Sequence, residues 1–92
     1  DCSGLTLRAW EQAGKTLPRT SREQWAATTR ITRSELQAGD LVFWSDNGDP
    51  SGIYHVALYS GDGKIVQAPA PGKTVEEVSI YSTNLIGFGR LP

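Results

Sequence analysis

The sequence contains very few residues of the kinds that build disulfides and metal sites. Among its 92 residues there is one cysteine, Cys2, and one histidine, His55. A single cysteine cannot form a disulfide within the chain, so cysteine usage does not identify the redox compartment. With only one histidine beside it, no Cys/His cluster with the spacing that binds zinc can be assembled. We therefore expect no metal site.

A long apolar run and a strong net charge are absent as well. No stretch approaches the roughly 18–20 apolar residues that cross a bilayer, and residues 1–10 lack the basic-then-apolar order of a signal peptide. The formal net charge of −1 gives no broad positive field toward phosphate backbones or anionic lipids. We expect no nucleic-acid partner and no membrane insertion, and any export signal is expected outside this sequence.

The chain does contain enough apolar material for one small core. Hydrophobic residues make up 38% of the chain and include three tryptophans. A chain of 92 residues has the size of one small domain. We expect residues 1–92 to form a single domain.

A helix is expected to begin at or beside Cys2. Apolar side chains recur at steps of three and four from Cys2 to Ala13, the period of one buried helix face, and Gly14 supplies a stop. The unpaired amides at a helix start favour negative charge, so they lower the pKa of a thiol placed there and make it a nucleophile. The alternative is a cysteine that serves as a small buried apolar side chain.

A second helix and a single turn should follow. Thr20 and Glu23 have the spacing of a capping box, which predicts a short helix through about Ala27. Thr32 and Glu35 repeat that spacing, but a glycine follows so soon that only one turn fits.

The remainder of the chain has the composition of strands. Short runs rich in β-branched and aromatic residues are separated by Asp, Asn, Gly and Pro, as is typical of strands and turns. These runs cover residues 40–44, 55–59, 64–68, 75–78 and 85–91. Helices followed by an antiparallel meander of four or five strands predict an α+β domain.

His55 and Gln67 are expected to meet across a hairpin. Strand alternation places His55 on the same face as Ala57 and Tyr59. A three-residue turn centred on Gly61 would pair His55 directly with Gln67, with Cβ atoms roughly 4.5–5.5 Å apart. Gln67 could then accept a hydrogen bond from the imidazole and direct its other nitrogen toward a nucleophile. Taken alone, His55 also fits a half-buried strand histidine without chemistry.

Five segments, in this order, resemble the NlpC-type cell-wall endopeptidases, which are small papain-like cysteine peptidases. The resemblance spans essentially all 92 residues and is carried by Asp1-Cys2-Ser3-Gly4-Leu5, Leu17-Pro18-Arg19-Thr20-Ser21, Leu36-Gln37-Ala38-Gly39-Asp40-Leu41-Val42-Phe43, His55-Val56-Ala57-Leu58-Tyr59 and Gln67-Ala68-Pro69. It implies a papain-like α+β fold in which N-terminal helices pack on a four- to five-stranded antiparallel half-barrel.

The same resemblance implies an activity and its residues. The expected reaction is hydrolysis of the link between γ-D-glutamate and a diamino acid in the stem peptides of bacterial peptidoglycan, without a cofactor. Cys2, His55 and Gln67 match the catalytic positions of the family. Asp1, Ser3 and Ser21 match positions that line the stem-peptide pocket in some members, although Asp1 and Ser21 also suit helix caps.

Three departures from the family pattern leave alternatives open. Tyr54 stands where a small Ser often precedes the histidine, which would narrow the pocket. The third catalytic residue of the family is commonly His, and Gln67 is a less usual polar substitute. Family domains usually begin some 20–30 residues before the position of Asp1, so part of the usual domain is expected to be missing here. The alternatives are a related Cys/His amidase acting on another bond, and a non-catalytic wall-binding domain. We expect a secreted or cell-envelope location, and a monomer flanked by other domains in the full-length protein.

Overall fold

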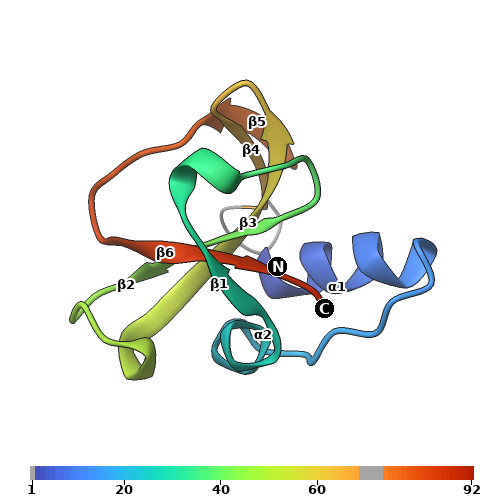
Figure 1. The fold of residues 1–92 in the computed structure, drawn as a ribbon, viewed down its shortest axis with the longest axis horizontal. Coiled ribbons are helices and arrows are strands. Elements are labelled where there is room, and N and C mark those ends of the chain that lie inside the picture. Colours follow the sequence, from blue (N-terminus) through green and yellow to red (C-terminus); the bar gives the residue numbers. More distant parts are fainter. Residues whose placement is uncertain (1, 69–73) are drawn as a thin grey trace.

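The computed structural model describes residues 2–68 and 74–92, with Cys2 described by its backbone alone. Within these ranges the chain forms two helices, two 3-10 turns and six strands (Figure 1). In chain order they are α1 (Cys2–Gln12), α2 (Ser21–Ala27), β1 (Thr29–Ile31), η1 (Arg33–Glu35), β2 (Leu41–Ser45), η2 (Pro50–Gly52), β3 (Ile53–Gly61), β4 (Lys64–Gln67), β5 (Glu76–Ser79) and β6 (Leu85–Arg90). Neither helix among the described residues has the length or apolarity that crossing a bilayer requires.

The strands form one antiparallel sheet in the order β1-β6-β2-β3-β4-β5. The α+β class is confirmed, but the expected count of four or five strands and the simple meander are wrong. The additional strand is β1, which pairs with β6 through Thr29↔Arg90 and Ile31↔Phe88. The three residues of β1 are mostly exposed, and so short a run has no hydrophobic periodicity that would predict a strand. This strand forms because its backbone pairs with the edge of β6. Strand β6 itself returns to pair with β2, outside the meander β2-β3-β4-β5.

All five residues of β2 are buried, because apolar clusters cover both faces of the sheet there. On one face, Leu41, Phe43 and Val56 pack with side chains from α1 and α2, including Trp10 and Trp25. The helices lie along that side of the sheet in Figure 1. The other face carries the second cluster, which contains Val42, Trp44, Ala57 and Ile65. Alternation along β2 and β3 therefore divides the core into a helix-covered half and a half formed by the curved sheet and its connections.

The helix ends follow the capping signals in the sequence. The Thr20 hydroxyl accepts from Glu23 N at 3.2 Å, and Glu23 Oε1 accepts from Thr20 N at 3.3 Å, which is the predicted capping box at the start of α2. Helix α1 ends before Gly14, whose φ of +82° favours glycine. The expected single turn is η1, where Thr32 N donates to Glu35 Oε1 at 2.7 Å. That backbone hydrogen bond holds the pKa of the Glu35 carboxyl below its usual range.

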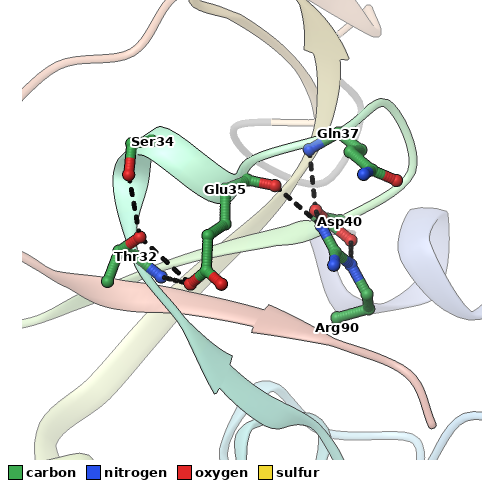
Figure 2. A network of polar contacts seen from close by, with 6 residues as sticks. All are labelled: Thr32, Ser34, Glu35, Gln37, Asp40 and Arg90. Atoms are coloured by element: carbon green, nitrogen blue, oxygen red, sulfur yellow. Dashed lines mark hydrogen bonds and ion pairs between the residues drawn. The ribbon is translucent and has the colours of Figure 1, made fainter.

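A polar network fastens η1 and the start of β2 to the end of β6 (Figure 2). Arg90 donates from Nε to Asp40 Oδ1 at 2.9 Å and from Nη2 to Asp40 Oδ2 at 2.8 Å. Its Nη2 also reaches the Glu35 backbone oxygen at 2.8 Å, while Gln37 N donates to Asp40 Oδ2 at 2.8 Å. The hydrogen bonds that Arg90 donates to Asp40 raise the pKa of its guanidinium above the usual value. One bidentate pair thus joins residues 50 positions apart.

Candidate functional site

His55 lies near the start of β3 and is only 6% exposed. As strand alternation predicts, it shares a sheet face with Ala57 and lies opposite Trp44 of β2. The His55 and Trp44 rings are 5.0 Å apart between centroids and inclined by 40°. The imidazole is therefore held against a rigid aromatic wall.

Gln67, the last residue of β4, contacts His55 through its side chain. Gln67 Oε1 lies 2.7 Å from His55 Nε2, and Gln67 is only 7% exposed. A carbonyl oxygen can only accept, so Nε2 is the donor and Nδ1 is the basic nitrogen of the neutral ring. The structure brings these two predicted residues together as a buried hydrogen-bonded pair.

The predicted direct cross-strand pairing of His55 with Gln67 is wrong. The ladder runs through Leu58↔Val66 and Tyr59↔Ile65 and then shifts before Gly61↔Lys64, because one extra residue bulges from β3 beside a shorter turn. Continued beyond Leu58↔Val66, this register sets Gln67 across from Ala57, so His55 is its diagonal neighbour. Diagonal positions lie roughly 7–8 Å apart at the backbone, and the long glutamine side chain spans that separation.

Tyr81 is part of this site, and the sequence analysis did not identify it. It lies in the connection between β5 and β6, and its hydroxyl donates to Gln67 Oε1 at 3.2 Å. Its ring stacks on Trp44 at 4.7 Å between centroids and 23° between planes. Trp44 Nε1 donates in turn to the Tyr81 backbone oxygen at 3.0 Å. No local pattern marks an aromatic residue in a loop as a contact of a residue 14 positions away.

Helix α1 starts at Cys2 and packs on β3, the strand that carries His55. The residue after the cysteine, Ser3, is 7% exposed, and its hydroxyl accepts from Arg19 Nη1 at 2.8 Å. The Ser3 backbone oxygen accepts from Thr6 Oγ1 and from Gln24 Nε2, both at 3.0 Å. The first turn of α1 is thus held by side chains of its own second turn and of α2.

Gln24 is the fully buried residue at the centre of these contacts, and it too was missed from the sequence. Its Nε2 donates to Ser3 O and to Pro18 O at 2.9 Å, and its Oε1 accepts from Thr6 Oγ1 at 2.6 Å. The one feature of the sequence that could have indicated this role is a polar residue on the buried face of a short helix.

The remaining predicted site residues are less completely placed. Ser21 is the first residue of α2, but the helix cap is Thr20, so the alternative reading of Ser21 as a cap is wrong. Asp1 lies outside the described residues. No group of three His, Cys, Asp or Glu residues gathers as a metal site anywhere in the described part of the chain.

Comparison with known proteins finds relatives across nearly the whole chain. The profile of the NlpC/P60 family matches residues 1–86. The chain is 46% identical to the probable endopeptidase p60 of Listeria seeligeri, covering 99% of this chain and 17% of that protein. It is 38% identical to the bifunctional muramidase/DL-endopeptidase CwlT of Bacillus subtilis, covering 99% of this chain and 28% of that protein. The chain therefore spans less than a third of these relatives.

Solved structures share the fold. An NlpC/P60 family protein from Bacillus cereus superposes with a TM-score of 0.89 at 32% identity, covering 100% of this chain and 32% of that one. RipD from Mycobacterium tuberculosis, described as a non-catalytic NlpC/p60 domain protein adapted to peptidoglycan binding, gives a TM-score of 0.85 at 28% identity. That match covers 100% of this chain and 67% of RipD.

Proposed function

The chain belongs to the NlpC/P60 family, and from that premise we propose that it is a cysteine endopeptidase acting on bacterial peptidoglycan. The proposed reaction is hydrolysis of the amide between γ-D-glutamate and a diamino acid in the stem peptide. The observation that carries the proposal is the buried 2.7 Å contact between Gln67 of β4 and His55 of β3, the strand against which the cysteine-bearing helix packs.

In this proposal Cys2 is the nucleophile. The amides at the start of α1 and the imidazole of His55 favour its thiolate, which attacks the amide carbonyl. Helix-start amides stabilise the oxyanion of the tetrahedral intermediate. His55 then protonates the leaving amine, the bond to the glutamyl carbonyl breaks, and water attacks the thioester with His55 as base. Gln67 keeps the proton on Nε2, so that Nδ1 carries out both transfers.

Three further residues are assigned to substrate binding. Asp1, Ser3 and Ser21 are proposed to line the pocket for the stem peptide. The contact of Ser3 Oγ with Arg19 supports a pocket beside the first turn of α1, because it brings a guanidinium close to that turn. A cationic group there suits the carboxylate-rich stem peptide.

The similar proteins support the proposed scissile bond, the peptidoglycan partner and the cell-envelope location. The names of p60 and CwlT describe endopeptidases, and the latter name specifies a DL-endopeptidase. We infer that the full-length protein acts in the cell envelope and that this chain is its catalytic domain. The small share of each relative that is matched supports additional flanking domains.

The similarity to RipD favours one other function, which is peptidoglycan binding without catalysis. The presence of Cys2, His55 and Gln67 argues against it, since a binding domain does not need a nucleophile with an oriented base. Thiol reactivity separates the two functions. Because Cys2 is the only cysteine, the rate of its alkylation against pH reports this residue alone. A catalytic thiolate titrates well below the free value of about 8.5, whereas an inert thiol does not.

The deciding experiment incubates the protein with purified stem peptides and identifies the fragments by mass. We expect cleavage between D-glutamate and the diamino acid, and complete loss of cleavage in Cys2→Ala with an unchanged circular dichroism spectrum. Undiminished cleavage by Cys2→Ala would exclude cysteine catalysis. Binding to peptidoglycan without cleavage by the wild type would instead establish the RipD-like function.

A further inference from the structure

We propose that Tyr81 is a positioning residue that fixes the orientation of the Gln67 amide and, through it, the tautomer of His55. The inference rests on the proposed function for its effect on turnover, but its structural part can be tested without any activity. It starts from the observation that Gln67 Oε1 accepts two hydrogen bonds, from His55 Nε2 at 2.7 Å and from the Tyr81 hydroxyl at 3.2 Å.

A glutamine depends on such a second contact more than other residues that orient a histidine do. Its amide presents an acceptor oxygen on one side and a donor NH2 on the other, and the two orientations have nearly the same shape. With the NH2 toward the ring, His55 Nε2 would become the acceptor and the proton would move to Nδ1. In that tautomer the nitrogen proposed to act as base is already protonated.

The Tyr81 hydroxyl favours the orientation seen. A phenol oxygen is a poor acceptor because its lone pair is delocalised into the ring, whereas its O–H is a good donor. In the flipped orientation the phenol proton would face an NH2 group, and the hydrogen bond it makes to Gln67 Oε1 would be lost. Tyr81 is 38% exposed, so after a flip its hydroxyl would have to donate to water or accept from the amide NH2. Either exchange gives up the hydrogen bond to the Gln67 carbonyl oxygen, so the hydroxyl stabilises the carbonyl-inward state.

Tyr81 can act this way because its ring and backbone are fixed. The ring stacks on Trp44, which is fully buried, and Trp44 Nε1 holds the Tyr81 backbone oxygen at 3.0 Å. The ends of the same connection are tied to the sheet by Ile80 N to Gly63 O at 3.0 Å and by Ser45 N to Asn84 O at 2.8 Å. Trp44 contacts both the Tyr81 ring and the His55 ring, so hydroxyl, amide and imidazole are held on one rigid support.

The test is Tyr81→Phe, which removes the hydroxyl and keeps the stacked ring. Since His55 is the only histidine, 15N NMR of imidazole-labelled protein reports its tautomer without assignment ambiguity. We expect the wild type to carry the proton on Nε2, and Tyr81→Phe to give a mixture of tautomers. The kcat should fall on the order of tenfold with KM little changed, a part of the roughly 10²–10⁴-fold that a general acid–base residue contributes. The matched control is Tyr59→Phe, which removes a hydroxyl at the turn end of the β3–β4 hairpin, where it accepts from Gly63 N at 2.9 Å, and should alter neither readout.

The Gln67→Glu variant distinguishes selection of one amide orientation from a general loosening of the site. In Gln67→Glu both side-chain oxygens accept, so no flip exists and adding Tyr81→Phe should leave the tautomer unchanged. A wild-type ring protonated on Nδ1, or a Tyr81→Phe tautomer equal to the wild type, would overturn the proposal. A mixed tautomer in Tyr81→Phe together with no peptide cleavage by the wild type would retain the positioning role and refute the peptidase.

Discussion

Replacement of Gln24 tests whether the first turn of α1 depends on a buried amide. The side chain of Gln24 is fully buried and makes three hydrogen bonds, to Ser3 O, Pro18 O and Thr6 Oγ1. Gln24→Met keeps most of the volume and removes all three bonds. Gln24→Ala removes the bonds and also leaves a cavity.

The magnitude follows from the number of hydrogen bonds removed. At about 1 kcal/mol for each buried hydrogen bond, Gln24→Met should lower the free energy of unfolding by about 3 kcal/mol. For a domain of this size each kcal/mol lowers Tm by roughly 4–8 °C, so a fall of about 12–24 °C is expected. Gln24→Ala should be less stable still, because apolar contacts are lost together with the bonds.

Urea unfolding followed by tryptophan fluorescence provides the assay, with free energies from linear extrapolation. Gln37→Met is the matched control, because Gln37 is exposed and its recorded contact to Asp40 uses the backbone N–H. We expect that variant to unfold like the wild type. A loss below about 1 kcal/mol for Gln24→Met, with the slope of the unfolding curve unchanged, would show that the amide does not hold the turn.

Two further predictions concern the proposed base and the polar network. His55→Ala should reduce kcat/KM for stem-peptide cleavage by at least about a hundredfold. Gln67→Ala should reduce kcat/KM less, because orientation of the base contributes less than proton transfer. The reverse order would show that Gln67 is misassigned. Arg90→Lys should lower Tm, since an ammonium cannot form the bidentate pair with Asp40. The control Arg33→Lys, at an exposed residue of η1, should leave Tm unchanged. Equal melting temperatures for the two variants would contradict a stabilising role of the pair.

The features that could be predicted from the sequence are those that depend on local pattern. The capping box at Thr20 and the two faces of β3 follow from spacing alone, and both are present. The register of the β3–β4 hairpin depends on its short turn and on one bulged residue, so a plausible three-residue turn gave a pairing that was off by two residues. Even so, His55 and Gln67 are in contact, because the long glutamine side chain reaches the imidazole from the diagonal position.

The parts that could not be predicted depend on contacts between distant segments. Strand β1 forms against β6, some 60 positions later, and carries no pattern of its own. Gln24 and Tyr81 acquire their roles only when helix, loop and sheet are packed together. An isolated polar residue on a buried helix face can be flagged as unusual, but its partners cannot be named before the tertiary structure is known.

The position of β6 between β1 and β2 has a consequence for how the chain reaches this structure. Both neighbours of β6 are synthesised far ahead of it, and among the described residues β1 pairs with no strand other than β6. A nascent chain that stops before Leu85 therefore exposes an unpaired edge of β2, a strand that is fully buried in the complete sheet. Such edges associate readily with other chains. Productive folding of this sheet therefore requires β6, and its core stays incompletely paired until residues 85–90 have been synthesised.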